Sequence, residues 1–138
     1  MSFPEKKFLL YGEDDIQNLQ VYDVALLPNF VLSKFNNNTI DLFFNSCSFS
    51  EMNYNTVKEY ISQIEFKCKR YLLHNNHNAR LVWREKGNKI TNMIADEVIP
   101  KNFELIYKKP RLFSLLEDTF VIHWFYKARY FVYLWEKK

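Results

Sequence analysis

Two short polar stretches carry most of the side chains in this sequence that could do chemistry. The first is Asn45 to Met52, NSCSFSEM, which follows the apolar run Ile40 to Phe44. The second is Asn75 to Asn78, NNHN, which follows the apolar run Arg70 to His74. Together they supply hydroxyls, amides, a carboxylate and an imidazole. Such groups are suited to binding a polar substrate and to moving one of its protons.

Within these stretches, His77 is the leading candidate for a general base, because imidazole titrates near neutral pH and can accept a hydroxyl proton. Glu51 is the alternative base, or a partner that orients the acceptor. The competing interpretation is structural, because Asn, Ser and His also cap helices and close turns. The meeting of two such stretches at one edge of a sheet leaves the functional and the structural interpretation equally open.

The elements around these stretches are expected to bring them together. The run Ile40 to Phe44 lacks clean alternation, which is typical of a strand buried on both faces of a parallel sheet. Thr56 and Glu59 have the spacing of a capping box, and apolar residues then recur at helical intervals as far as Cys68. A strand, loop, helix, strand succession predicts a parallel pair whose polar ends lie at the same edge. Ligands bind at that edge in open α/β sheets.

The rest of the chain predicts further strands around this unit. We expect strands at Lys7 to Tyr11, Val21 to Leu27, Phe103 to Tyr107 and Tyr130 to Trp135, with helical segments at Phe30 to Phe35 and Asn92 to Glu97. A closing antiparallel pair on an otherwise parallel sheet is common in α/β folds. We find no linker or internal repeat, so we predict a single α/β domain over residues 1–138.

Composition excludes several classes of protein. The 138 residues are 48% hydrophobic and 25% charged, which is ordinary for one globular domain. The only glycines, Gly12 and Gly87, are isolated, so no glycine-rich phosphate loop is present. The net charge of +3 is dispersed and does not indicate nucleic-acid binding. We expect Cys47 and Cys68 to be reduced thiols in a cytoplasmic protein, because no signal peptide or membrane-spanning run is found.

Three segments carry a resemblance to a known family: LLPNF at Leu26 to Phe30, the run from Asp41 to Met52, and HNNHN at His74 to Asn78. They resemble the sugar O-methyltransferases, class I enzymes that use S-adenosylmethionine. The resemblance covers nearly the whole chain and implies a Rossmann-like, mostly parallel sheet with flanking helices. The family's glycine-rich cofactor loop and acidic ribose ligand are not found, so the chain resembles the C-terminal part, without the first strands.

The resemblance also implies roles for individual residues. The implied reaction is methyl transfer to a hydroxyl of a sugar or glycan precursor. Because the cofactor loop is lacking, the chain alone is expected to bind S-adenosylmethionine weakly or not at all and to have little activity. The implied cofactor contacts are Pro28, Asn29, Asn45 and Ser46; the implied substrate contacts are Ser48, Asn75 and Asn76; the implied catalytic residues are His77 and Glu51.

Other functions remain open at this point. A sheet without its first strands exposes apolar surface, which predicts a non-catalytic module that self-associates or packs against a missing N-terminal half. The aromatic and basic residues from Trp124 to Lys138 could stack on single-stranded nucleic acid, but the final strand is apolar on both faces, which favours a core element. His74, His77 and His123 lack acidic companions, so we expect no metal site.

Overall fold

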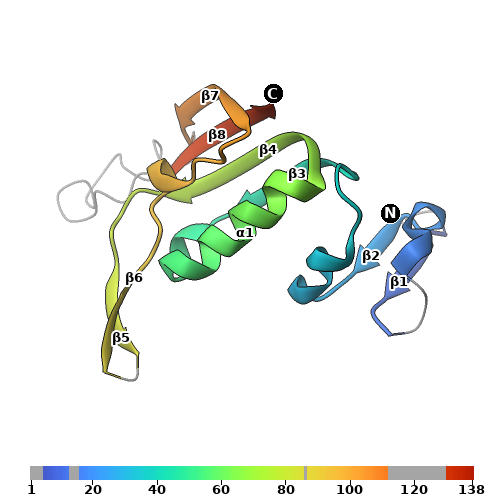
Figure 1. The fold of residues 1–138 in the computed structure, drawn as a ribbon, viewed down its shortest axis with the longest axis horizontal. Helices are drawn as coiled ribbons and strands as arrows, with labels where there is room; N and C mark the ends of the chain where they lie inside the picture. The colour runs from blue at the N-terminus through green and yellow to red at the C-terminus, as the bar shows by residue number, and fades with distance from the viewer. Residues whose placement is uncertain (1–4, 13–15, 86, 112–129) are drawn as a thin grey trace. The chain divides into compact units, whose positions relative to one another are not determined.

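The computed structural model of the chain describes residues 5–12, 16–85, 87–111 and 130–138. These residues form two compact units, Met1–Phe35 and Asn36–Lys138, whose elements are labelled in Figure 1. The predictions that concern the acidic turn Glu13 to Asp15 and the aromatic run Phe120 to Tyr126, with His123, lie outside the described residues.

The first unit contains one parallel pair of short strands, β1 (Phe8–Leu10) and β2 (Val24–Leu26). Two 3-10 helices accompany them, η1 (Ile16–Val21) and η2 (Asn29–Lys34). The Asp23 carboxylate joins the strands' starts, because it accepts hydrogen bonds from the Lys7 backbone N–H and from Lys6 Nζ, both at 3.0 Å. These bonds hold the pKa of Asp23 below its ordinary value.

The second unit is built on a four-stranded sheet with the order β3-β4-β8-β7 (Figure 1). β3 and β4 are parallel, whereas β8 lies between β4 and β7 and runs antiparallel to both. A separate antiparallel hairpin pairs β5 with β6. In chain order the elements are β3 (Ile40–Ser46), η3 (Phe49–Glu51), α1 (Tyr54–Lys67), β4 (Cys68–His77), β5 (Val82–Glu85), β6 (Asn88–Thr91), η4 (Ala95–Glu97), β7 (Phe103–Pro110) and β8 (Tyr130–Lys137).

The predicted Rossmann-like, mostly parallel sheet with flanking helices is therefore wrong. Only one strand pair of the main sheet is parallel, and α1 is the single α-helix of the described residues. A parallel sheet needs a long crossover, usually a helix, before each new strand. After β4 the chain instead makes the β5–β6 hairpin, whose turn uses Gly87 at φ +84°, a left-handed conformation that favours glycine. The helix predicted at Asn92 to Glu97 is only the short η4.

The helix predicted between the two parallel strands is confirmed, but its start is not where the sequence placed it. The N-cap is Asn53, whose side chain accepts a hydrogen bond from the Thr56 backbone N–H at 2.9 Å. Thr56 therefore lies inside the first turn and is not the cap of a capping box with Glu59. An Asn side chain is as effective an N-cap as Ser or Asp.

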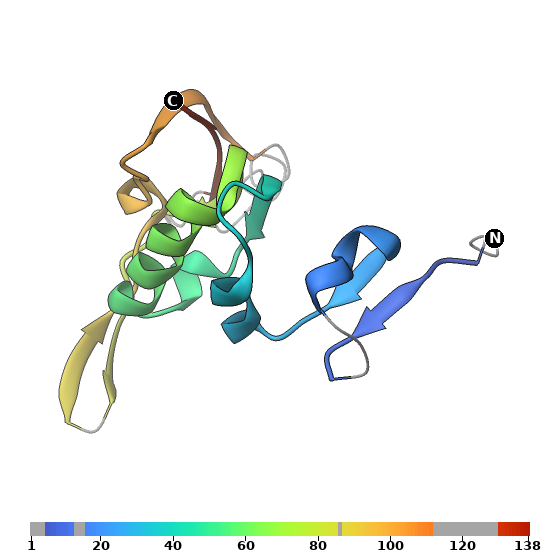
Figure 2. The same cartoon turned by 45° about the vertical axis from the view of Figure 1, so that its right-hand side comes forward.

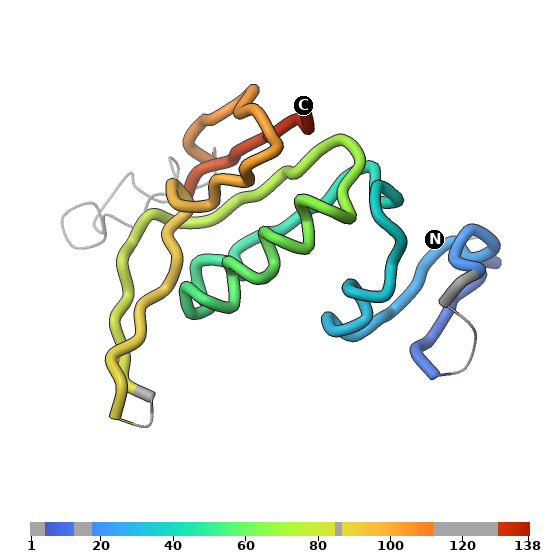
Figure 3. The backbone as a smooth tube through the Cα atoms, in the orientation of Figure 1, coloured from blue at the N-terminus to red at the C-terminus, as the bar shows by residue number. Residues whose placement is uncertain are grey.

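α1 lies against one face of the sheet (Figure 2), and the buried side chains between them form the hydrophobic core. Ile61 and Ile64 of α1 pack with Leu72 of β4 and with Tyr133 and Trp135 of β8. Side chains of a strand alternate between the two faces of a sheet, so every second residue of β4 and β8 enters this core. The backbone trace in Figure 3 shows α1 running along β3 and β4, and this helix therefore determines which face of both strands is covered.

The prediction that β3 is buried on both faces is also wrong. β3 is an edge strand of the sheet, and only Phe43 of its aromatic pair packs against the core. Leu42 and Phe44 point to the opposite face, where they are 50% and 60% exposed. The alternation of buried and exposed positions is not visible in the sequence, because both faces of this strand carry apolar side chains. No helix of the second unit's described residues covers that opposite face.

Candidate functional site

The two polar stretches meet, as the sequence predicted, because β3 and β4 are parallel neighbours. Asn45 pairs with His74 and Ser46 with Asn75, and the Cys47 backbone N–H donates to the Asn75 carbonyl at 2.7 Å. The second stretch is not a loop, however. β4 continues through His77, which pairs with Tyr130 of β8. Strand geometry therefore decides where these polar side chains point.

Alternation along the strands separates the predicted residues into two groups. Asn45 and Asn76 lie on the face covered by α1, where Asn76 is fully buried. Ser46 and Asn75 lie on the opposite face, and Asn75 Nδ2 donates to Ser46 Oγ at 3.3 Å. The Asn75 amide oxygen is buried and has no partner among the described residues. The predicted substrate contacts are thus divided between the two faces of the sheet.

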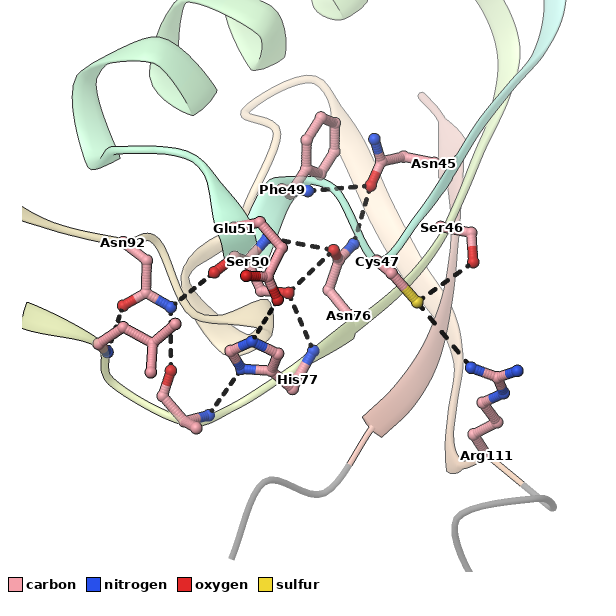
Figure 4. Close-up of polar contacts among 12 residues, drawn as sticks. Asn45, Ser46, Cys47, Phe49, Ser50, Glu51, Asn76, His77, Asn92 and Arg111 are labelled. Carbon is pink, nitrogen blue, oxygen red and sulfur yellow. Dashed lines mark hydrogen bonds and ion pairs between the residues drawn. The ribbon is translucent and has the colours of Figure 1, made fainter. Parts of the chain in front are cut away.

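The buried group is a closed network of amides and hydroxyls (Figure 4). Asn76 Oδ1 accepts from the backbone N–H of Ser50 at 3.2 Å and from its hydroxyl at 3.3 Å. Asn76 Nδ2 donates to Asn45 Oδ1 at 3.0 Å, which also accepts the Phe49 N–H at 3.3 Å. Asn45 Nδ2 in turn donates to Ser48 Oγ. These side chains fix the η3 turn against β4, because buried polar groups are stable only when they are paired.

His77 and Glu51 form the pair at the edge of this network (Figure 4). The Ala79 backbone N–H donates to His77 Nδ1 at 3.1 Å, so Nδ1 is an acceptor and the ring proton lies on Nε2. Nε2 then donates to Glu51 Oε1 at 3.1 Å. The His77 side chain is 6% exposed and that of Glu51 is 56% exposed. Both ring nitrogens of His77 are thus occupied, and the carboxylate is the accessible member of the pair.

Asn92 is a structural centre of this region that no sequence pattern indicated. Its buried amide donates to the carbonyls of Ser50 and Ala79, both at 2.9 Å, and accepts from the Leu81 N–H at 2.8 Å. It thereby joins the turn after β3 to the segment after β4. Ser50 and Asn92 are 42 positions apart, and no local pattern indicates a contact at that separation.

His74 is buried in the core behind this network. Its ring stacks on Tyr133, with 4.5 Å between the ring centroids, and its Nε2 lies 3.3 Å from the Trp135 indole nitrogen, which donates to it. Burial lowers the pKa of His74 to about 4, against a smaller opposing effect of the negative charge on Asp96. His74 is therefore a neutral core residue at pH 7.

A second polar cluster, also absent from the sequence predictions, surrounds Asp96. Its carboxylate accepts from Lys108 Nζ at 2.6 Å, from Asn78 Nδ2 at 3.1 Å and from the Tyr133 hydroxyl. Burial alone would raise the pKa of Asp96, but these bonds outweigh burial and lower it. Burial and the bond to Asp96 raise the pKa of Tyr133. The cluster connects η4 to β7 and β8 and has the arrangement of a structural ion pair.

Two of the residues expected to hold S-adenosylmethionine, Asn45 and Ser46, are already bonded within the fold. The Asn45 amide is committed to Ser48, Phe49 and Asn76, and Ser46 is bonded to Asn75. Pro28 and Asn29 belong to the first unit, at the start of η2. Gly12 and Gly87 each stand alone in a turn, and no atom lies within 4 Å of the position that a Cβ would take. The described residues offer no backbone cradle of the kind that dinucleotide-like cofactors need.

The described part of the chain contains no cluster of three His, Cys, Asp or Glu side chains that could hold a metal ion. Cys47 and Cys68 are free thiols. Within the same ranges, none of the helices combines the length and the apolar character that crossing a bilayer requires. No protein-family description matches the chain, and no curated protein is similar to it at a significant level.

Proposed function

We propose that this chain supplies the acceptor side of an O-methyl transfer site, at which a hydroxyl of a sugar or glycan precursor is modified. The resemblance of the segments around Asp41 to Met52 and His74 to Asn78 to sugar O-methyltransferases motivates the proposal. The observation that carries it is the Glu51 carboxylate, which is exposed at the meeting point of the two polar stretches and held 3.1 Å from His77 Nε2.

In this proposal Glu51 accepts the proton of the acceptor hydroxyl. A general base must be able to reach the proton that it removes, and the exposed carboxylate satisfies that condition without rearrangement. His77 positions the carboxylate by donating from Nε2, and the Ala79 N–H holds the ring in that tautomer. Use of His77 itself as the base, as the sequence suggested, requires the ring to leave one of these bonds first. In this proposal the described residues supply only the acceptor side and do not hold S-adenosylmethionine, the methyl donor of the resembling family.

Sugar binding by the full chain tests this proposal without requiring activity. We expect methyl glycosides of common hexoses to shift the amide resonances of Glu51 and its neighbours in an NMR titration. Glu51→Gln should weaken the binding, because it removes the charge from the accepting oxygen. The matched control is Glu59→Gln, which lies on the exposed surface of α1 and should leave the titration unchanged. Shifts that do not include Glu51, or no shift with any sugar, contradict the proposal.

Calorimetry with S-adenosylmethionine tests whether this chain alone binds the methyl donor. The described residues offer no fitting cradle, so we expect no measurable heat of binding at micromolar cofactor. Tight binding by this chain alone would contradict the proposal that it supplies only the acceptor side.

A second candidate function is a non-catalytic interaction module. The observation that favours it is independent of Glu51. The sheet face opposite α1 carries Leu42 and Phe44, which are half exposed or more, although the same strand packs Phe43 into the core. Soluble monomers seldom leave large connected apolar patches uncovered, so this face is suited to a partner.

A further inference from the structure

The side of the four-stranded sheet opposite α1, which no helix of the second unit's described residues covers, is called the open sheet face. The strand register arranges its side chains in three rows across β3, β4, β8 and β7. One outer row consists of Leu42, Tyr71, Glu136 and Glu104. The other outer row consists of Ser46, Asn75, Val132 and Lys109. The middle row is Phe44, Leu73, Leu134, Tyr107.

The middle row makes this face an interaction surface. All four of its residues are apolar or aromatic, and Phe44 and Tyr107 at its ends are 60% and 43% exposed. With strands about 4.8 Å apart and a two-residue repeat of about 6.8 Å, the three rows cover roughly 19 by 20 Å. Two such faces packed together bury less area than a standard specific interface, which corresponds to weak, reversible association.

The charged residues of the open sheet face indicate which partner can bind to it. Glu104 and Lys109 both lie on β7, in opposite outer rows, so one end of that strand is acidic and the other basic. Lys109 Nζ lies 5.7 Å from the centre of the Tyr107 ring, so the lysine side chain reaches across the face toward the middle row. A two-fold axis along the middle row places Glu104 of one copy opposite Lys109 of the other, so this pair is complementary to itself, whereas Glu136 of β8 then faces Val132.

We propose that the open sheet face binds a second copy of this chain, face to face, about a two-fold axis that runs along the middle row. Under this symmetry the middle rows of the two copies pack against each other. β7 of one copy lies over β7 of the other, and the two strands run antiparallel. Glu104 of each copy then faces Lys109 of the other. The alternative axis, parallel to the strands, places both Glu104 and Glu136 over apolar residues, Leu42 and Tyr71, whereas the chosen axis places only Glu136 over an apolar residue.

This inference names the partner that an interaction module would bind, and it is independent of the proposed O-methyl transfer. The residues that carry it, Phe44, Glu104 and Lys109, are distinct from the Glu51–His77 pair, and the sugar titration does not depend on them. Loss of sugar binding and loss of association can therefore be told apart in the same set of variants.

Sedimentation equilibrium of the full chain, from about 1 to 100 μM, tests the inference. We expect a monomer–dimer equilibrium with a dissociation constant in the micromolar range. Phe44→Glu should raise that constant at least about tenfold, because it places a charge in the apolar centre. The matched control is Phe66→Glu on α1, where Phe66 is 58% exposed but lies outside the open sheet face. Circular dichroism establishes that each variant is folded.

Charge reversal tests the symmetry and does not depend on the folding of the Phe44 variant. Glu104→Lys and Lys109→Glu should each weaken the dimer several-fold, because each places like charges opposite one another. The chain that carries both reversals should recover the original affinity. A monomer at about 100 μM, or a dimer that Phe44→Glu leaves unchanged, overturns the proposal. A doubly reversed chain as weak as the single variants overturns the two-fold arrangement.

Discussion

The two faces of the β3-β4-β8-β7 sheet differ in how completely their groups are paired. On the face covered by α1, Asn45 and Asn76 have bonds at both ends of their amides, and His74 is sealed between Tyr133 and Trp135. On the open sheet face, Phe44 and Tyr107 are partly exposed, at 60% and 43%. Asn45 and Asn76, which the sequence suggested as cofactor and substrate contacts, are thus bonded within the fold, whereas apolar residues of β3 that looked like core are exposed on the opposite face.

The largest expected effect is a loss of folding stability when Asn92, on the covered side, is replaced. Asn92→Ala leaves the carbonyls of Ser50 and Ala79 and the Leu81 N–H without their partner. Burying several unpaired backbone groups costs about 4 kcal/mol in total. Urea unfolding followed by circular dichroism measures the loss, with Asn55→Ala on the exposed side of α1 as control. A loss below about 1 kcal/mol would show that water pairs these groups equally well.

Acid should destabilise the covered side through His74. The pKa of His74 is about 4 in the folded chain, well below the ordinary 6.5 expected when the chain is unfolded. Between these values the unfolded chain binds a proton that the folded chain does not, so stability falls as the pH drops from about 6.5 to about 4, by about 3 kcal/mol in all. Unfolding titrations across this range measure the slope.

The matched variant for that measurement is His74→Phe, which keeps an aromatic ring against Tyr133 and cannot take up a proton. Its stability should depend less on pH over the same range than that of the native chain. Equal slopes in the two proteins would mean that another group is responsible for the acid sensitivity.

The smallest expected effect is at Glu51. Glu51→Gln removes a half-exposed charge but leaves an oxygen that can accept from His77 Nε2, so the free energy of unfolding should change by less than about 1 kcal/mol. Thermal unfolding at pH 7 measures the change. A small effect on stability together with a loss of sugar binding would separate Glu51 from the structural network around it. A large loss of stability would place it within that network.

The local order of elements was predictable, because it rests on patterns a few residues long. Apolar runs indicated β3, β4, β7 and β8, and helical spacing indicated α1. The sheet's strand order was not predictable, because it depends on the connection that leaves β4. A hairpin closed by Gly87 and the short η4 occupy the place where a parallel fold needs a crossover helix.

The candidate site was predicted in part for a similar reason. The meeting of the two polar stretches follows from the parallel pairing of β3 and β4, which the intervening helix implied. The partners of each side chain do not follow from it. Asn75 to His77 were expected in a loop but continue β4, so neighbouring residues point to opposite faces. Asn92 and Asp96 act through contacts far apart in the chain, which no local pattern reveals.

Hydroxyl-radical labelling of the full chain at low and high concentration tests the contrast between the two faces most directly. It reports the exposure of individual side chains in solution. We predict that Phe44, Tyr71 and Tyr107 lose labelling as the concentration rises through the dimer's dissociation constant, whereas Phe66 on α1 remains labelled and Phe49 remains protected throughout. Labelling of Phe44 and Tyr107 that is equal at both concentrations, or protection that appears at Phe66 instead, would contradict the account.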